Sequence, residues 1–350
     1  MIRGLRAWVS KGALIAAILC ATALPCRAQT PLPPDFRVTR AAQAPKIDGQ
    51  LDDAAWQEGP LRLGDWLSYN PLRGESGSPQ TDVFVTYDER NLYFAFHCFD
   101  DQPDKIRTTL TRRDNSFNDD WVGLSLDSTG TRQTAYHLMV NPSGIQMDAV
   151  NTSSSGERFE TDLVWDSAGR VTSDGYVVEI ALPLQTIRFA NGDHVRMGIL
   201  FWRHVSRTGK SFSWPDMPPG DWVFNRHAHL TFDRLNQRRL VELIPSATYP
   251  ISETRATPDR WNPVTGNPDA GLSGKFGITS NVTLDGTINP DFSQVESDAF
   301  QVQVNQRFPV FFDEKRPFFM EGFGLFNMAG TGRDGNMRIA VHTRRIVDPI

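Results

Sequence analysis

The chain has 350 residues and a nearly balanced charge, with 36 Lys and Arg against 41 Asp and Glu and a net charge of −5. It contains no long basic run, which argues against nucleic acid as a partner. Of its 3 cysteines, Cys20 and Cys26 fall in an expected signal peptide, so Cys98 is left alone and the mature chain has no intramolecular disulfide.

The first 28 residues have the features of a signal peptide. Basic residues precede an apolar run over residues 13–24, which is shorter than the roughly 20 residues of a membrane-spanning helix. We expect cleavage after Ala28 and export to the periplasm or outer membrane of a Gram-negative-type bacterium. A lipoprotein attached through Cys26 and an uncleaved anchor remain alternatives.

The mature chain is long enough for about two domains. Residues 29–44 form a proline-bearing lead-in, and residues 45–235 contain short apolar or alternating segments between turn signals. These segments are 82–87, 91–99, 121–127, 135–141, 145–150, 175–182 and 196–204. Helical periodicity is scarce, with short turns expected only at 52–58 and 183–187. The pattern predicts an all-β protein with an antiparallel β-sandwich over residues 45–235.

Residues 236–350 have a different character. Residues 239–249 predict one strand that contains a proline, and residues 271–288 alternate lightly, with glycine, serine and threonine between larger apolar residues. This is the pattern of outer-membrane β-barrel strands. A barrel needs at least about eight strands to close, and only three or four are expected here. We expect that the chain is truncated relative to a longer barrel protein; completion by another polypeptide is the alternative.

Five ordered segments between residues 38 and 232 carry a family pattern. They are Ile47-Asp48-Gly49 with Asp52, Asp53 and Trp56; Tyr87-Asp88 with Asn91-Leu92-Tyr93; Asp119-Asp120-Trp121 leading to Asp127; Gly175-Tyr176 with Glu179-Ile180 and Pro183; and Met197-Gly198 with Phe201. Together they resemble carbohydrate-binding module family 9. The resemblance implies a β-sandwich that binds the ends of sugar chains and often accompanies glycoside hydrolase domains.

Two motifs in the C-terminal region carry a second resemblance. Residues 289–296 read NPDFSQVE, and residues 314–319 read EKRPFF. They resemble an uncharacterised family of exported bacterial proteins, in which this region follows a family 9 module and continues into an outer-membrane β-barrel. The resemblance implies the outer membrane as a partner of residues 236–350. The phenylalanine-rich segment 308–326 fits either an interfacial or plug element, or a core segment that joins the domains.

Sugar recognition needs aromatic faces and planar hydrogen-bonding groups. Four aromatic residues lie in loop-like segments and are candidates for stacking on a sugar: Trp66, Tyr69, Trp214 and Trp222. Packing over the end of the sandwich is the alternative for the three tryptophans. Three tryptophans in strand-like or turn segments are interpreted as core residues: Trp56, Trp121 and Trp202.

A charged loop supplies the other candidates for sugar binding: Arg112, Arg113, Asp119 and Asp120. Arginine forks pair with vicinal hydroxyls, and the acids could accept from them. The resemblance also implies calcium near this loop, although Asn118, Asp119, Asp120 and Asp127 supply only part of the roughly six oxygens that calcium needs. An Arg–Asp pair that braces the loop is the alternative.

The sequence therefore predicts an exported envelope protein that binds a poly- or oligosaccharide without catalysis and serves polysaccharide breakdown or uptake. One alternative is a glycoside hydrolase or hydrolase accessory, with its acids drawn from Glu157, Glu160, Asp162 and Asp166. Another is an outer-membrane structural or transport component without a sugar ligand. His227 and His229 share one face of a strand, which fits either a metal pair or a strand end.

Overall fold

The computed structural model describes residues 34–77, 80–153, 156–159, 162–218, 220, 223–236, 241–249, 251–252, 255–257, 260–261, 265–266, 268–278 and 283–289. The expected signal peptide and the motifs after Asn289 lie outside the described residues.

The larger of the two sandwich sheets has nine strands in the order β1-β13-β11-β5-β6-β7-β8, with β12 paired to β11 and β2 paired to β12. They are β1 (Asp35–Arg37), β2 (Leu67–Asn70), β5 (Trp121–Asp127), β6 (Thr134–Val140), β7 (Gln146–Thr152), β8 (Gly156–Arg158), β11 (Gly192–Val205), β12 (Lys210–Trp214) and β13 (Ala228–Leu235). All pairs are antiparallel except β1 with β13. Part of the expected lead-in therefore forms an edge strand.

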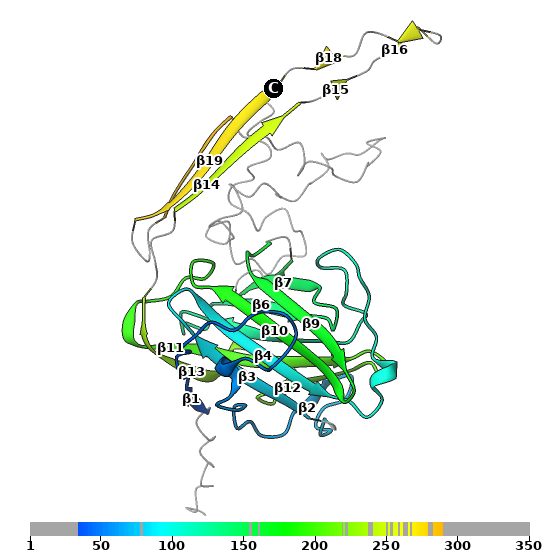
Figure 1. Ribbon diagram of the computed structural model, residues 1–350, viewed down its shortest axis with the longest axis vertical. Helices are drawn as coiled ribbons and strands as arrows, with labels where there is room; N and C mark the ends of the chain where they lie inside the picture. Colours follow the sequence, from blue (N-terminus) through cyan, green and yellow to red (C-terminus); the bar gives the residue numbers. More distant parts are fainter. Residues whose placement is uncertain are drawn as a thin grey trace, which may run out of the picture. The chain divides into compact units, whose positions relative to one another are not determined.

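The smaller sheet has four antiparallel strands in the order β3-β4-β10-β9. They are β3 (Thr81–Tyr87), β4 (Asn91–Phe99), β9 (Asp166–Thr172) and β10 (Gly175–Pro183). The two sheets pack face to face (Figure 1), and one apolar core fills the space between them. Its members include Phe94 and Phe96 of β4, Val178 and Ile180 of β10, Leu124 of β5 and Phe201 of β11.

Strand β5 shows how alternation produces two different faces. Val122, Leu124 and Leu126 lie in the core between the sheets, whereas Trp121 lies in a separate cluster. Successive side chains of a strand point to opposite sides of the sheet, so these two clusters occupy opposite sides of the larger sheet. The outer side of the smaller sheet is covered by the 3-10 helix η1 (Ala54–Trp56).

The C-terminal part contains a three-stranded antiparallel sheet in the order β14-β19-β20. Its strands are β14 (Val241–Thr248), β19 (Asp269–Gly277) and β20 (Thr283–Ile288). Two short pairs lie between β14 and β19 in the chain: β15 (Ile251–Ser252) with β18 (Thr265–Gly266), and β16 (Arg255–Thr257) with β17 (Arg260–Trp261). The described parts of the segments expected to form strands at 239–249 and 271–288 contain β14, most of β19 and β20.

The prediction of an all-β sandwich is confirmed. The described residues contain the 3-10 segments η1, η2 (Pro103–Lys105) and η3 (Val223–Asn225) and no α-helix. Strands β4 and β5 begin and end at the expected residues. Five strands of the sandwich were not expected from the sequence, because they are short or rich in polar residues: β1, β2, β8, β9 and β12. No helix of the described part of the chain is long and apolar enough to cross a membrane.

Candidate functional site

The side of the larger sheet that faces away from the smaller sheet, the outer face, carries a cluster of aromatic and polar side chains. Cross-strand partners in an antiparallel pair project to the same side of the sheet. The register pairs Trp121 with His204, Gly123 with Trp202, and Ser125 with His137. Strand pairing therefore brings together rings that are up to about 80 residues apart in the chain.

Two indole rings of the outer face each contact an imidazole. Trp121 stacks on His204 with ring centroids 5.6 Å apart and an interplanar angle of 20°, and Trp202 meets His137 edge to face at 4.7 Å and 82°. Burial lowers the pKa of His204, whose Nδ1 lies 2.9 Å from Ser211 Oγ. A neutral imidazole has one nitrogen that can accept a hydrogen bond, so these rings can bind hydroxyl groups.

The outer face is largely covered, and Trp121 and Trp202 are only 9% and 7% exposed. Val223 and Phe224 of η3 pack on it, and Phe159 and Met217 lie half-buried beside them. Phe117 meets Phe159 edge to face with centroids 5.1 Å apart and an interplanar angle of 86°. Phe117 remains 38% exposed, so the rim of the cluster presents an aromatic ring to solvent.

Several buried polar atoms of the outer face have no hydrogen-bond partner in the part of the chain that the structure describes. They are His137 Nε2, Asn151 Oδ1, Trp202 Nε1 and Ser213 Oγ. A buried polar group without a partner costs about 1–3 kcal/mol. The outer face thus offers unpaired donors and acceptors beside aromatic rings, a combination that fits a ligand rich in hydroxyl groups.

Glu157 controls the hydrogen-bonding character of His137. Its Oε1 lies 2.6 Å from His137 Nδ1, because strand β8 pairs with β7 next to β6. In the neutral tautomer that carries its proton on Nδ1, His137 donates to this carboxylate and its unpaired Nε2 accepts hydrogen bonds.

A serine and a histidine also meet on this side of the sheet. Ser125 Oγ lies 3.0 Å from His227 Nε2, within the range of a nucleophile and its base. Both side chains are buried, and burial lowers the pKa of His227 to about 3. His227 Nδ1 has no partner among the described residues, so no described carboxylate orients the ring. Within the described part of the chain, the pair therefore lacks the third member of a catalytic triad.

Comparison with known families identifies the domain that carries the outer face. The family model described as "Carbohydrate family 9 binding domain-like" matches residues 47–222, about half of the 350-residue chain. The chain belongs to this family. A second model, "Domain of unknown function (DUF5916)", matches residues 241–331.

Solved structures similar to the family 9 domain are distant in sequence. A putative carbohydrate-binding protein from Bacteroides uniformis is 12% identical, with a TM-score of 0.43 over 57% of this chain and 100% of that one. A family 9 carbohydrate binding module from Caldicellulosiruptor kristjanssonii was solved with cellotriose and with glucose. Both structures are 15% identical, with a TM-score of 0.39 over 58% of this chain and 95% or 98% of theirs. None of the curated proteins matches this chain.

The family 9 domain places the predicted stacking residues in different environments. Trp66 and Trp214 are only 2% and 6% exposed, and both lie against Phe201 in the core between the sheets. Tyr69 lies half-buried at the outer face, where burial raises the pKa of its hydroxyl to about 12. Trp222 lies outside the described residues. Trp66 and Trp214 lie between the two sheets, and this position favours packing over stacking for these two rings.

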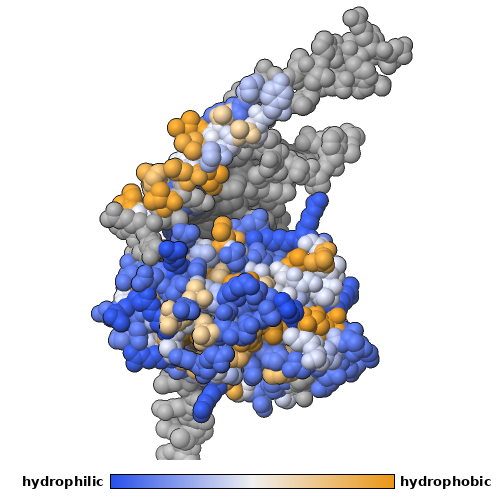
Figure 2. Space-filling view, in the orientation of Figure 1, coloured by the Kyte–Doolittle hydropathy of each residue, from blue (hydrophilic) through white to orange (hydrophobic). Residues whose placement is uncertain are grey.

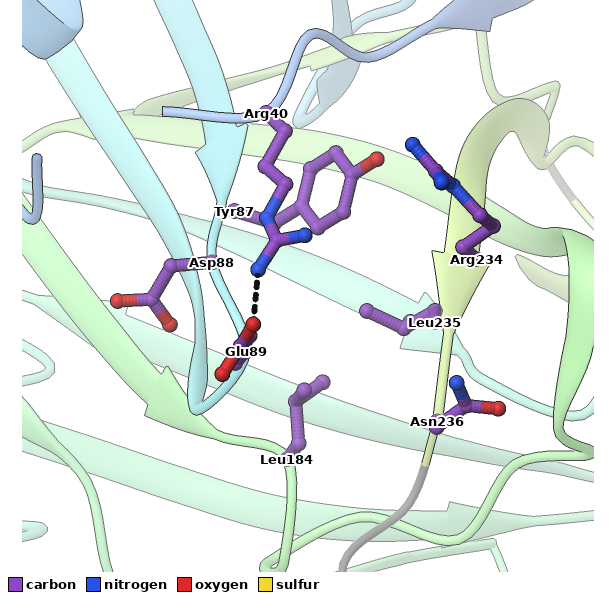
Figure 3. Close-up of a pocket in the computed structure, with 8 residues that line it drawn as sticks. All are labelled: Arg40, Tyr87, Asp88, Glu89, Leu184, Arg234, Leu235 and Asn236. Atoms are coloured by element: carbon purple, nitrogen blue, oxygen red, sulfur yellow. Dashed lines mark hydrogen bonds and ion pairs between the residues drawn. The ribbon is translucent and has the colours of Figure 1, made fainter. Parts of the chain in front are cut away.

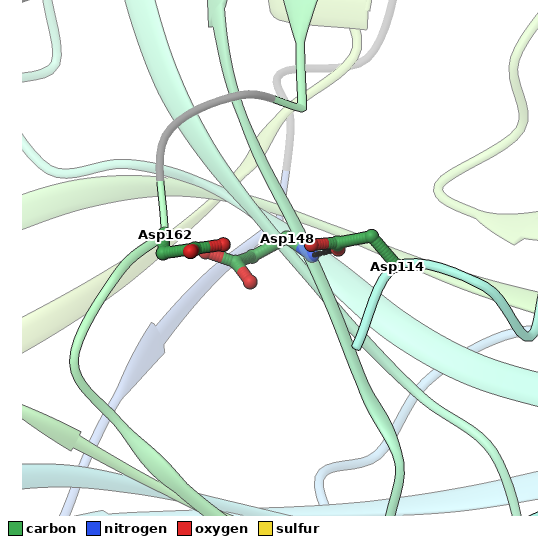
Figure 4. Close-up of side chains that lie close together, drawn as sticks. All are labelled: Asp114, Asp148 and Asp162. Atoms are coloured by element: carbon green, nitrogen blue, oxygen red, sulfur yellow. Dashed lines mark hydrogen bonds between the residues drawn. The ribbon is translucent and has the colours of Figure 1, made fainter. Parts of the chain in front are cut away.

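The arginine of the charged loop is held by ion pairs. Arg113 Nε donates to Asp148 Oδ1 at 2.6 Å, and its Nη2 donates to the Leu163 carbonyl at 2.7 Å. Asp114 and Asp162 lie 4.0 and 3.6 Å from Arg113 Nε. Among the described residues, only these three aspartates (Figure 4) have the spacing of metal ligands. Because a guanidinium already lies against them, the arrangement fits bracing of the loop better than a cation site.

Asp119 and Asp120 are buried and engaged by protein donors. Asp119 accepts hydrogen bonds of 2.8 to 3.0 Å from Thr109 and Asn141, and Asp120 accepts one of 2.8 Å from the backbone N–H of Arg107. Three of the four carboxylate oxygens are therefore engaged by the protein, whereas Asp120 Oδ1 is buried without a partner among the described residues. Neither aspartate belongs to the described group that has the spacing of metal ligands.

The remaining predicted residues have separate surroundings. Arg112 is exposed, Asp162 lies near Arg113, Asp166 is exposed, and Glu160 lies outside the described residues. The sequence did not single out His137. It predicted Trp202 as a buried residue, which the structure confirms, but not that the ring lies on the outer face. The alternation of side chains along β6 and β11 could have indicated this position. His137 and Trp202 project to the side of the sheet that faces away from the core between the sheets.

Proposed function

We propose that this chain binds carbohydrate at the outer face and catalyses no reaction on it. The observation that carries the proposal is the set of buried polar atoms without partners beside the rings of Trp121 and Trp202. A sugar ring presents an apolar C–H face and a surrounding set of hydroxyl groups, which indole rings and unpaired donors and acceptors complement. The match of residues 47–222 to the family 9 carbohydrate-binding domain supports the same role.

Each unpaired atom has a definite part in this proposal. The indole N–H of Trp202 donates to a hydroxyl oxygen, whereas His137 Nε2 and Asn151 Oδ1 accept from hydroxyl protons. The exposed ring of Phe117 adds apolar contact at the rim. A neutral hydrogen bond contributes about 1 kcal/mol net, so a few such contacts support binding in the millimolar range.

Calorimetric titration of the full chain against a panel of oligosaccharides, with cellotriose and glucose included, tests the proposal. Trp202→Phe keeps an aromatic ring but removes the unpaired N–H, and we expect it to weaken binding several-fold. The matched control is Trp66→Phe, which removes an equally buried and unpaired indole N–H from the core between the sheets. This control should leave affinity unchanged.

Two results would contradict the outer face as the sugar site. One is the absence of saccharide binding at millimolar concentration by the folded chain. The other is normal saccharide affinity in Trp202→Phe together with weaker affinity in Trp66→Phe, which would indicate a sugar site at Trp66.

The C-terminal sheet supports a second part of the proposal, in which the exported chain associates with the outer membrane during polysaccharide breakdown or uptake. One face of this sheet is apolar by register and solvent-exposed. Its residues, 41% to 72% exposed, are Val241 and Leu243 of β14, Leu272 and Phe276 of β19, and Leu284 and Ile288 of β20. Orange groups of this sheet are visible in Figure 2.

The opposite face of the C-terminal sheet is more polar. It carries Lys275 across from Asp285, and Ser273, whose hydroxyl lies 2.9 Å from that of Thr287. Ile244 is an apolar exception on this side. A sheet with one continuous exposed apolar face has the surface expected of a membrane-contacting element.

Flotation of the full chain with vesicles of phosphatidylethanolamine and phosphatidylglycerol tests membrane association. We expect the double variant Phe276→Lys/Leu284→Lys to float less than the wild type. Its control, Ser273→Lys/Thr287→Lys, adds the same charge to the polar face and should float normally. An equal loss of flotation in both variants would show that added charge alone prevents binding to the vesicles. Export is tested separately: a cytoplasmic product that retains residues 1–28 would contradict it.

A further inference from the structure

A cavity of about 370 Å³ opens at one end of the sandwich, where the turn between β3 and β4 meets the end of β13 (Figure 3). Its apolar walls are Tyr87, Leu184 and Leu235, which also belong to the core between the sheets. The cavity is therefore separate from the outer face. Its volume lies within the range of about 300–1,000 Å³ that is typical of small-molecule sites.

Two arginines lie on opposite sides of this cavity (Figure 3). Arg40 Nη2 donates to Glu89 Oε1 at 2.8 Å, so its charge is already paired. The guanidinium of Arg234 makes no hydrogen bond or ion pair with any residue that the structure describes. The cavity thus contains one guanidinium whose charge has no counterpart in the described protein.

The nearby carboxylate of Asp88 does not compensate Arg234. Its Oδ1 accepts the backbone N–H groups of Arg90 and Asn91 at 2.6 and 2.8 Å, and its Oδ2 accepts the hydroxyl of Tyr93 at 2.9 Å. These bonds hold the turn between β3 and β4. Asp88 is therefore part of the cavity wall, and it does not neutralise the charge of Arg234.

The backbone at Arg234 is strained. Its φ of 50° lies in the left-handed region, which residues other than glycine, asparagine and aspartate rarely adopt. Strain of this kind concentrates at binding sites. Here it occurs at the residue that carries the unpaired cation.

We propose that this cavity binds a carboxylate-bearing ligand of about the size of one sugar ring, such as a uronic acid, with Arg234 as the anion contact. The planar guanidinium can hold both oxygens of a carboxylate at once. Leu184, Leu235 and Tyr87 supply apolar surface for the ring. This inference does not rest on the outer face, because the two sites share no residue.

Calorimetric titration of the full chain with galacturonate, galactose and acetate tests the inference. Galactose has the ring without the carboxylate, and acetate has the carboxylate without the ring. We expect galacturonate to bind at least about tenfold more tightly than either, because a hydrogen-bonded charge gives about that factor. Arg234→Gln should weaken galacturonate binding by a similar factor, and Arg62→Gln, at an exposed arginine outside the cavity, should not.

Two further variants separate binding from folding and from the outer face. Arg234→Gly suits the left-handed backbone, so it should keep the unfolding midpoint and still lose galacturonate binding. Trp202→Phe should bind galacturonate normally even if it loses neutral oligosaccharides. Equal binding of galactose and galacturonate, normal affinity in Arg234→Gln, or no galacturonate binding by the folded chain would each overturn the inference.

Discussion

The Glu179 carboxylate of β10 accepts the indole N–H of Trp56 at 2.9 Å, across 123 residues of sequence. Its other oxygen accepts the backbone N–H groups of Asp48 and Gly49 at 2.9 and 2.7 Å, and that of Gln50 at 3.3 Å. One buried carboxylate thus fastens the first family 9 motif to the outer side of the smaller sheet. This contact explains why that motif combines an Asp-Gly turn with a tryptophan.

Loss of the Glu179 carboxylate should destabilise the domain strongly. Glu179→Ala leaves four donors without their acceptor, and buried donors without partners cost about 1–3 kcal/mol each. We expect a loss of about 3 kcal/mol or more in the free energy of unfolding, measured by urea denaturation. Glu58→Ala, at an exposed position, should change it by less than about 0.5 kcal/mol. Similar small effects in both variants would show that the contact contributes little.

The effect of Glu179→Gln should depend on pH. Burial raises the pKa of Glu179 above its usual value of 4.5, although hydrogen bonds from Asp48 and Trp56 oppose the shift. A raised pKa means that stability from this group is complete below about pH 4.5 and is lost as the pH rises through the folded-state value. Glutamine does not titrate. The deficit of Glu179→Gln relative to the wild type should therefore shrink from pH 4 to pH 7 in urea unfolding; a growing deficit would contradict the shift.

Gly49 is required by both its backbone and its neighbours. Its φ is +80°, and an added Cβ would lie 3.1 Å from Arg170 Cβ and 3.2 Å from the carbonyl carbon of Gly169. Gly49→Ala should cost about 1–2 kcal/mol for the left-handed backbone and a further increment for crowding. The matched variant Gly59→Ala has φ +83° with no atom within 4 Å, so it should show the backbone cost alone. Equal thermal shifts in the two variants would exclude the crowding term.

Arg113 should act as a brace for Asp148. Removing one partner of a buried ion pair typically costs about 3–5 kcal/mol, because the other charge stays buried. We expect Arg113→Met to destabilise the chain by about 3 kcal/mol and Asp148→Asn to recover much of this loss when combined with it. A double-mutant cycle by urea denaturation measures the coupling. Simply additive losses would argue against the brace.

Glu157 should affect sugar affinity and not turnover. Glu157→Gln removes the carboxylate that accepts a hydrogen bond from His137 Nδ1. The ring then loses the contact that favours the tautomer in which Nε2 is an acceptor. We expect oligosaccharide binding to weaken several-fold by calorimetry, with aryl-glycoside hydrolysis at background in both variant and wild type. Hydrolysis by the wild type that disappears in Glu157→Gln would instead support the glycoside hydrolase alternative.

The sequence by itself determined the strands with a strong apolar signal. Strands β4 and β5 match their expected bounds because their residues are buried along nearly their whole length. Strand β9 escaped detection because its residues are small or polar and none is fully buried. The ordered family motifs were also readable without the structure, since each lies in a short contiguous segment.

Only the tertiary structure decided which side chains share the candidate site. Trp66 and Trp214 looked available because they lie near loop-like segments, yet both are buried between the sheets. Trp202 is buried, as the sequence predicted, but it packs with His137 on the outer face and not between the sheets. Alternation tells which residues of one strand share a side, but not which side faces the second sheet. That choice depends on long-range pairing between β5, β6 and β11 and on the packing of the two sheets.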